Sequence, residues 1–471
     1  MSIKQGQISK FFVIFLFVHV LIWTLIPTLA NFNLPLDTIE VLAWASDIQW
    51  GYDKHPPLSA WFSGLVFKIF LNQDWAYYLL SQLFVIISFV IVWKFSEDFF
   101  QNKIYSLVSV LLLEGIYFYN FTTPEFNVYV CELPFWALTV LYCWKGIKQN
   151  DYASWLLFGL FAGLGVLSHY LFFYLLIALG LFFIYMIFKK EFNSKCLISL
   201  ITFLIVLLPH LIWLMENNFI TIAYALHRTG LEESGFLNHL YYSLIFVVKQ
   251  IGILVPFFIM LLIIISKFKY KIEFKDKKLI FLIIINVAPL LLIFLTSFFL
   301  GIRIKTMWMT PFYLFTGVLC VYIFQNNIKA GRFRYFLNVF LFLFILSPLI
   351  YFFHSIFKKD ERTDYPGKEV AQFIQTKWDN TFSNKIEIVF GNIWFAGNLS
   401  YHLKSRPEWT GGMWHGIKEI PENTNGGTIL IGDYKDDISA HKFCTSSNTS
   451  THIVILQLKS FNHSVCMIGK K

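Results

Sequence analysis

Residues 11–30 have the sequence FFVIFLFVHVLIWTLIPTLA, and this run decides the fold class. A helix of that length crosses about 30 Å of hydrocarbon. Lys4 and Lys10 precede the run, but it is longer than a secretion signal and lacks a persuasive cleavage site, so we expect an uncleaved span with a cytoplasmic amino terminus. Further apolar runs predict about eleven spans, near 11–30, 76–94, 104–120, 128–145, 154–168, 170–188, 197–215, 237–265, 279–299, 310–325 and 334–354.

Composition points to the same class. Of 471 residues, 57% are hydrophobic, 20% aromatic and 14% charged, which excludes soluble, collagen-like and disordered proteins. The net charge of +9 does not indicate a nucleic-acid partner, because the basic residues lie in short gaps between apolar runs. The gaps on one side hold most of these residues, and the opposite side has few, chiefly Lys54, Arg228, Arg303 and Lys305. The positive-inside rule then predicts which segments lie outside the cytoplasm. They are 31–75, 121–127, 216–236, 300–309 and the carboxyl terminus.

The sequence after about residue 356 is mixed and polar, which predicts two domains: a membrane part, 1–355, and a soluble external part, 356–471. A disulfide between Cys444 and Cys466 is chemically permitted there, and the sequence leaves open whether it forms. Patterning in this part predicts a small α/β domain. We expect helices at 368–378 and 393–402 and strands at 385–390, 427–432 and 452–458.

Two carboxylates and two bases follow the first span. Asp37 and Glu40 share one helix face, and the stretch 50–58, WGYDKHPPL, ends in a proline pair that returns Lys54 and His55 towards them. One interpretation is the solvated polar face of a helix at the membrane interface. The other is a site in which a carboxylate positions or deprotonates an acceptor while cations hold a phosphate.

Several signatures of other functions are missing from the sequence. It contains no P-loop, no cysteine and histidine spacing for zinc and no dinucleotide fingerprint, so we expect neither metal nor cofactor. The missing P-loop disfavours an ATP-driven pump.

The order of these features resembles the GT-C glycosyltransferases. An Asp-x-x-Glu helix after the first span, a Gly-Tyr-x-x-His-Pro-Pro-Leu turn, a helical bundle and a terminal external domain together resemble the ArnT-like and protein-mannosyltransferase-related enzymes of bacteria. Three motifs of the tail resemble a bacterial subgroup that carries such a domain. They are Pro366-Gly-Lys-Glu-Val, Trp394-Phe-Ala-Gly and Arg406-Pro.

The resemblance implies an all-α polytopic GT-C fold of about 11–13 transmembrane helices with interfacial helices, plus a small periplasmic α/β domain. It implies transfer of a sugar from a polyprenyl (undecaprenyl) phosphate donor to an envelope acceptor outside the inner membrane, with inversion at the anomeric centre. Lipid A or another envelope glycolipid is the favoured acceptor; the sequence leaves protein acceptors and the identity of the sugar open.

The resemblance also implies roles for the first outer segment. Asp37 becomes the principal catalytic or acceptor-orienting residue, and Glu40 is its neighbour. The family commonly has a lysine before the proline pair that meets the donor phosphate. In this chain His55 occupies that position and Lys54 precedes it, so either residue is a candidate for the phosphate.

Other outer segments supply further candidates. Relatives often have a second carboxylate where Glu125 lies, or Asn127 replaces it at the aligned position as an acceptor-binding residue; the alternative is a solvated loop acid. Where relatives have Lys-Tyr, this chain has His169 and Tyr170, which either face the donor or pack between helices.

Basic residues complete the predicted site. Arg303 and Lys305 lie just outside a span and either clamp the donor phosphate or extend to the lipid headgroups. Arg228, in a loop with the glycines of a flap, is a candidate for an anionic acceptor.

A polytopic transporter or lipid flippase is the alternative function. It predicts functional ionisable residues halfway through the bilayer, where Glu114, Glu132 and Lys249 fall, although we do not assign these three to a site. It does not account for the interfacial carboxylates or for the external domain.

Overall fold

The computed structural model describes residues 5–229, 235–267, 275–411, 426–433, 452–458 and 463–470. The chain divides into two compact units. The last segment of unit 2 begins at Ser355, close to the expected domain boundary, but residues 28–53 and 59–77 also belong to this unit. The functional division into 1–355 and 356–471 stays a prediction. Unit 1 comprises Met1–Pro27, Lys54–Leu58 and Tyr78–His354, and unit 2 comprises Thr28–Asp53, Ser59–Tyr77 and Ser355–Lys471.

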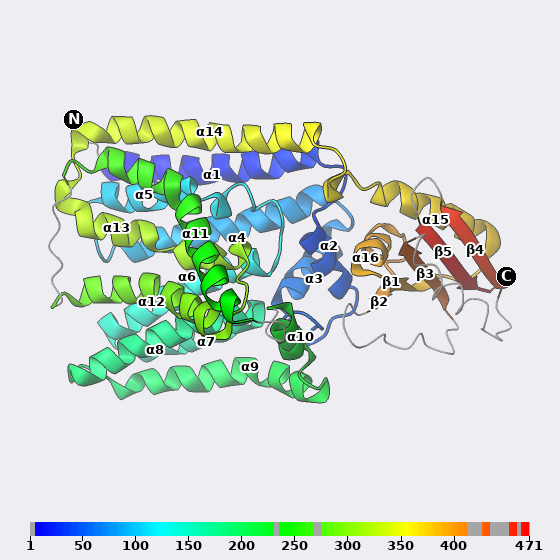
Figure 1. Ribbon diagram of the computed structural model, residues 1–471, viewed down its shortest axis with the longest axis horizontal. Coiled ribbons are helices and arrows are strands. Elements are labelled where there is room, and N and C mark those ends of the chain that lie inside the picture. The colour runs from blue at the N-terminus through cyan, green and yellow to red at the C-terminus, as the bar shows by residue number, and fades with distance from the viewer. Residues whose placement is uncertain are drawn as a thin grey trace. The chain divides into compact units, whose positions relative to one another are not determined.

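Unit 1 is a helical bundle (Figure 1), whose first and last helices extend into unit 2. Its longer helices are α1 (Gln5–Ala30), α4 (Asp74–Ser96), α5 (Lys103–Leu111), α6 (Val128–Gln149), α7 (Tyr152–Ser168), α8 (Phe173–Phe188), α9 (Ile198–Glu216), α10 (Ile220–Arg228), α11 (Phe236–Ile264), α12 (Lys277–Leu300), α13 (Thr316–Phe324) and α14 (Phe333–Phe357). Short 3₁₀ segments are η1 (Leu112–Gly115), η2 (Tyr117–Tyr119), η3 (Tyr170–Phe172), η4 (Ser194–Leu197), η6 (Thr306–Tyr313), η7 (Gln325–Asn327) and η8 (Ala330–Arg332).

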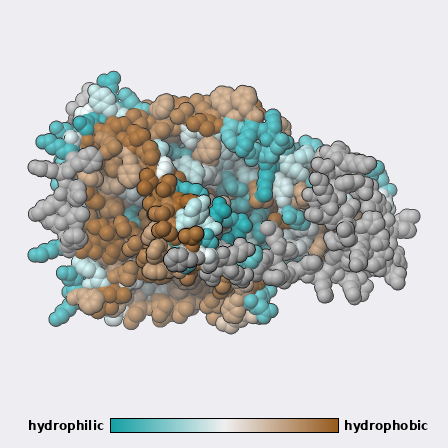
Figure 2. All heavy atoms as spheres, in the orientation of Figure 1, coloured by the Kyte–Doolittle hydropathy of each residue, from teal (hydrophilic) through white to brown (hydrophobic). Residues whose placement is uncertain are grey.

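Seven helices of the described residues are long and apolar enough to cross a membrane, or eight if the bent pair around η6 and α13 is one span. Figure 2 shows a broad apolar surface over unit 1, as contact with lipid requires. The chain is therefore a multi-pass membrane protein. The count is lower than the expected eleven, because the stretch 104–120 breaks into α5 and short 3₁₀ turns, α7 has only 17 residues, and α6 does not meet the same test.

Glycines allow α7 and α9 to pack closely. A Cβ atom at Gly159 would lie 2.1 Å from both Ser199 O and Thr202 Oγ1, and one at Gly163 would lie 2.7 Å from Val206 Cγ1. Small residues four apart are a common device for close helix approach in membranes, where dispersion contacts replace the hydrophobic effect. This pair therefore fixes α9 against α7 and, through it, the start of α10.

Unit 2 joins two early helices to the C-terminal domain. The early helices are α2 (Leu36–Trp44) and α3 (Leu58–Phe70), and α2 packs on α16 of the domain (Figure 1). The C-terminal elements are η9 (Arg362–Asp364), α15 (Gly367–Thr381), β1 (Ile386–Gly391), α16 (Ile393–His402), β2 (Glu408–Thr410), β3 (Gly427–Asp433), β4 (His452–Leu458) and β5 (His463–Gly469).

The five strands form one mixed sheet in the order β2-β1-β3-β5-β4. Strand β1 pairs in parallel with β2 and β3, while β5 pairs antiparallel with β3 and β4. Helices α15 and α16 cover the sheet, and Ile374, Trp378 and Leu399 pack with Val389 and Ile429 in its core. The sheet thereby holds α16 in a fixed place.

The expected fold class is confirmed, including the small C-terminal sheet domain. The two helices and three strands predicted for this domain are all present, and α16 and β4 have the expected bounds. The sequence analysis missed β2 and β5. Cys466 is disulfide-bonded, whereas Cys444, its proposed partner, lies outside the described residues.

Replacement of Gly159 by Leu should separate α7 from α9. We expect overpacking to destabilise the protein by about 1–3 kcal/mol and to lower its melting temperature in detergent, followed by size-exclusion chromatography after heating. Gly180→Leu on α8 is the matched control, since nothing lies within 4 Å of a Cβ atom there. Equal stability of the two variants would contradict the proposed packing.

Candidate active site

Basic and aromatic side chains gather in unit 1 at the turn that precedes α3. The Lys54 side chain is buried, and its ammonium lies 5.9 Å from the centre of the Tyr224 ring on α10. The ring of His55 is 5.3 Å from that of His169 and 6.4 Å from that of Tyr224. Pro56 and Pro57 follow directly and exclude a helix at this point. The turn thus presents both bases to the break between α7 and η3.

His169 occupies that break. Its Nδ1 accepts a hydrogen bond from the Leu171 amide (3.3 Å), so the proton of the neutral ring lies on Nε2. The Tyr129 ring packs against it with centres 5.0 Å apart. Oε2 of the buried Glu132 is 3.7 Å from Nδ1, which is beyond hydrogen-bond distance. Tyr129 and Glu132, both of α6, therefore lie against the imidazole of His169.

Burial and neighbouring charges decide which of these groups are cationic. Burial, followed by the effects of His169, Lys54 and Arg228, holds the pKa of His55 well below its usual value. Burial lowers the pKa of His169 to about 3. Both imidazoles are consequently neutral near pH 7 in the ligand-free protein. Lys54 and Arg228 act on His55 as positive charges.

The predicted basic loop lies next to this cluster. The Arg303 amide donates a hydrogen bond to the carbonyl of Thr229, which follows Arg228 at the end of α10 (3.3 Å). Arg228 and Arg303 are both exposed, and Lys305 is partly buried. The structure therefore brings the 301–305 segment beside the end of α10.

Tyr170 supports α10. Its hydroxyl lies 2.8 Å from His210 Nε2 on α9 and also hydrogen-bonds Thr221 at the start of α10. Tyr170 thus places the helix that carries Tyr224 and Arg228. Its expected contact with the donor stays a prediction.

The predicted acids lie on α2, in unit 2. Asp37 is in the first turn, where the helix dipole favours negative charge, and it is partly exposed, whereas Glu40 is buried. The loop after the helix is held by side chains: Trp61 donates to the Gln49 carbonyl (2.8 Å), and the Tyr52 hydroxyl donates to the Asp47 carbonyl (3.0 Å).

The 121–127 loop is anchored at both ends. Ser81 and Gln82 of α4 contact Thr123, and the Oδ1 atom of Asn127 accepts the Tyr129 and Val130 amides, each at 3.1 Å, as the cap of α6. The side-chain oxygen of Asn127 is thus used within the protein. Glu125 is partly exposed on this loop.

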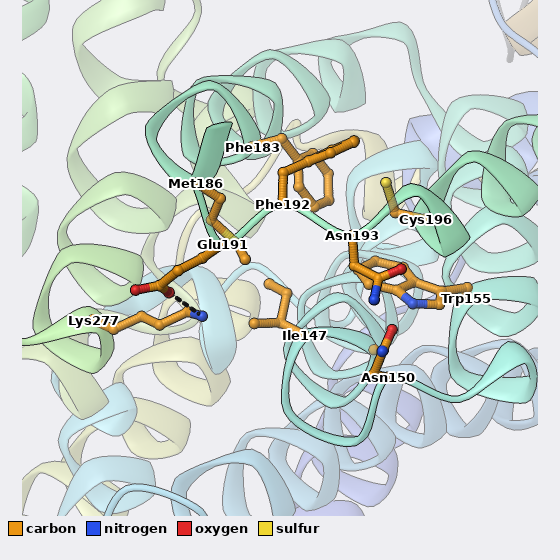
Figure 3. Close-up of a pocket in the computed structure, with 11 residues that line it drawn as sticks. Ile147, Asn150, Trp155, Phe183, Met186, Glu191, Phe192, Asn193, Cys196 and Lys277 are labelled. Carbon is orange, nitrogen blue, oxygen red and sulfur yellow. Dashed lines mark hydrogen bonds and ion pairs between the residues drawn. The ribbon is translucent and has the colours of Figure 1, made fainter. Parts of the chain in front are cut away.

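A pocket of about 140 Å³ lies elsewhere in unit 1 (Figure 3). It is lined by the end of α6, the start of α7, the end of α8 and the following turn, and an ion pair of 2.8 Å joins Glu191 and Lys277 at its edge. None of the predicted site residues lines it. In the described part of the chain, no three His, Cys, Asp or Glu side chains come together as a metal site.

Comparisons with known proteins now bear on this geometry. Residues 54–213 match the family described as dolichyl-phosphate-mannose-protein mannosyltransferase, and no curated protein matches the sequence. Two structures of ArnT from Cupriavidus metallidurans align over 98% of this chain and 98% of theirs. The undecaprenyl phosphate complex has 11% identity and a TM-score of 0.65, and the apo state has 10% and 0.64.

The chain has the fold of ArnT, and its residues 54–213 match a glycosyltransferase family. The family match begins at Lys54 and includes His55, Glu125, His169 and Tyr170, so it covers most of the basic cluster. The resemblance stated from the sequence and the enzyme class are confirmed, and the transporter or flippase alternative has no support from these comparisons. The individual roles of the site residues stay predictions.

Two residues that the structure brings to the cluster were not assigned to it from the sequence. Glu132 carried a signal, an ionisable group within an expected span, but nothing in the sequence linked it to His169. Tyr224 carried no signal, since one aromatic residue on a short helix is ordinary.

Substitutions of Asn127 distinguish its capping of α6 from its predicted contact with the acceptor. We expect Asn127→Ala to lose the cap of α6 and about 1 kcal/mol of stability, while Asn127→Asp keeps the cap, both followed by thermal unfolding in detergent. If Asn127→Asp keeps stability but loses sugar transfer, the acceptor-binding prediction gains support. An unaffected melting temperature for Asn127→Ala would contradict the capping role.

Proposed function

We propose that this glycosyltransferase moves a sugar from a polyprenyl-phosphate donor to a lipid acceptor of the bacterial envelope, with lipid A or lipopolysaccharide as first candidate. The family that matches residues 54–213 is named for a dolichyl-phosphate sugar, and one structurally similar ArnT is bound to undecaprenyl phosphate. The observation that carries the proposal is the buried Lys54 ammonium beside His55, His169 and the charge of Arg228.

This cluster is suited to a phosphate. Charged and neutral hydrogen-bond donors both bind phosphate oxygens, and a phosphodiester carries one negative charge before transfer and two after the sugar has left. Lys54 and Arg228 supply charge, while the neutral His55 and His169 supply hydrogen bonds. Arg303 and Lys305 would reach the same phosphate from the neighbouring loop. The cluster thus favours the leaving group over the intact donor.

The acids of α2 would act on the acceptor. In an in-line displacement the acceptor oxygen attacks the anomeric carbon from the face opposite the phosphate, so the configuration inverts. Asp37 orients the attacking group or takes its proton, and Glu40 stands beside it. An acceptor phosphate is already ionised, and Asp37 would then act through position and charge. In the second outer loop, Glu125 is the candidate for a further catalytic carboxylate and Asn127 for an acceptor contact.

The distribution of basic residues supports a site on the periplasmic side of the inner membrane. The lysine-rich gaps favour a cytoplasmic position for one end of the bundle, and the segments that carry Asp37, Lys54 and Arg303 belong to the opposite end. A polyprenyl-linked sugar is available at that leaflet without nucleotide. We expect a cytoplasmic amino terminus and a periplasmic C-terminal domain.

Mass spectrometry of envelope lipids identifies the acceptor. Cells with and without the protein should differ by one sugar mass on a lipid A or core species. A sugar found only on protein would replace the lipid acceptor by a protein acceptor within the same mechanism. If neither the lipids nor the proteins differ between the two kinds of cell, the proposed function is wrong.

Asp37→Asn should abolish most sugar transfer. A positioned acid or base contributes about 10²–10⁴-fold, so we expect a loss of that size in kcat, with membrane insertion intact. Asp379→Asn is the control, because Asp379 is an exposed carboxylate of unit 2 that accepts a hydrogen bond from Gln375 (2.8 Å) and makes a long contact to Lys404 (3.9 Å). Full turnover by the Asp37 variant would exclude its proposed role.

Lys54 and His55 should differ in their response to substitution and pH. We expect Lys54→Met to lower kcat/KM by about 10- to 100-fold, the value of a charged hydrogen bond, and His55→Asn to lower it less. Because the pKa of His55 is depressed, it stays neutral from pH 6 to pH 8, and kcat/KM should show no histidine limb there. A limb near pH 6.5 that His55→Asn removes would contradict this assignment.

A further inference from the structure

Helix α2 is tightly docked on the C-terminal domain. At Gly397 of α16, a Cβ atom would lie 3.0 Å from Ile39 Cγ2 and 3.2 Å from Ala43 Cβ, so a larger residue here would require its neighbours on α2 to shift. Ile39 lies between the two predicted catalytic acids in sequence. The backbone that carries Asp37 and Glu40 is thereby held by α16.

Arg406 binds the carboxyl end of the same helix. Its guanidinium donates hydrogen bonds to the Leu42 carbonyl in the last turn of α2 and to Ser400 Oγ (3.0 Å), and it stacks over the Phe67 ring of α3 at 4.3 Å. Carbonyls of a last helical turn lack partners within the helix. Arg406 supplies one, and its charge also complements the negative end of the helix dipole.

The backbone of Arg406 is strained at this contact. Its φ is 50°, a left-handed conformation that residues other than glycine seldom adopt. Such a conformation persists only where surrounding contacts hold it, and it is common at functional sites. The contacts to Leu42, Ser400 and Phe67 are the ones that hold it.

The segments on both sides of α2 are tied to the domain as well. Before the helix, the amides of Phe32 and Asn33 both donate to the Thr363 carbonyl at 3.0 Å. After it, Ser46 Oγ accepts the Trp409 amide at 2.8 Å. The helix is therefore held at its start, along one face and at its end.

Helix α2 needs this support. It has nine residues and no side-chain cap at its start, where Pro35 stands, and isolated helices of such length are marginal in water. Catalytic groups require placement to within about 0.5 Å. Neither propensity nor capping in α2 supplies such precision.

We propose that the C-terminal domain is the positioning scaffold of α2, with Arg406 and Gly397 as its positioning residues, and that sugar transfer requires α2 to stay docked on α16. This inference rests on the proposed function for its activity readout. It assigns the domain a role in the reaction that does not require the domain to bind donor or acceptor.

A disulfide tests the docking directly. The 3.2 Å separation is close to the Cβ separation of disulfides, so Ala43→Cys with Gly397→Cys should cross-link in the full-length protein under oxidation. We expect the cross-linked enzyme to keep at least half of its turnover. Failure to cross-link, or activity lost on oxidation and restored by reductant, would overturn the proposal; the wild type with reductant controls for the native disulfide.

Substitution of Arg406 tests the positioning role. We expect Arg406→Met to speed hydrogen exchange in residues 36–44 and to lower kcat about 100-fold, with the KM for the donor within about twofold, and Arg406→Lys to recover part of both. Lys404→Met is the matched control, because this neighbouring side chain is 82% exposed. Unchanged protection of α15 shows that the domain stays folded.

The outcomes separate the two proposals. Unchanged exchange and turnover in Arg406→Met would overturn the scaffold. A raised KM for the acceptor with kcat unchanged would also overturn it, in favour of acceptor binding by the domain. If the wild type transfers no sugar, the proposed function is wrong. Faster hydrogen exchange in Arg406→Met would then still show that α2 depends on the domain for its structure.

Discussion

Hydrocarbon offers no hydrogen-bond partner to a peptide group, and this constraint governs the structure of unit 1. Helices satisfy their own backbone, and a break is tolerated only where protein supplies the missing partner. The break between α7 and η3 shows how: the imidazole of His169 accepts the Leu171 amide that the helix leaves unpaired. The same break carries a polar side chain into the bundle. His169 thus pairs with the backbone at the break and also belongs to the basic cluster.

The basic cluster combines neutral and positively charged side chains. Burial keeps both imidazoles neutral, and the positive charge of Lys54 further lowers the pKa of His55. Neutral hydrogen-bond donors recognise a phosphate in either charge state, whereas a fixed cation interacts more strongly as negative charge grows. Fixed side chains that stabilise a departing phosphate in this way make a divalent ion unnecessary for the proposed reaction.

Sequence patterns predicted elements with a clear period or boundary. Helix α16 was predicted from its apolar spacing, and the structure adds a cap by Asn392, whose side chain accepts the Trp394 amide. Strand β5 was missed because all seven of its residues are buried and give no alternation, and β2 because it has three residues. The basic candidates followed from topology and resemblance. The contacts of Glu132 and Arg406 join distant segments, and one sequence carries no signal for such pairs.

The hydrogen bond from Arg406 to Leu42 joins residues 364 positions apart. At a synthesis rate of about 5–20 residues per second, α2 leaves the ribosome roughly 20–70 s before its partner exists. If the C-terminal domain is the scaffold of α2, the acids lack their support during that interval. A chain that ends early would then insert with an incomplete catalytic centre, and the enzyme would become competent only when its last domain has been made.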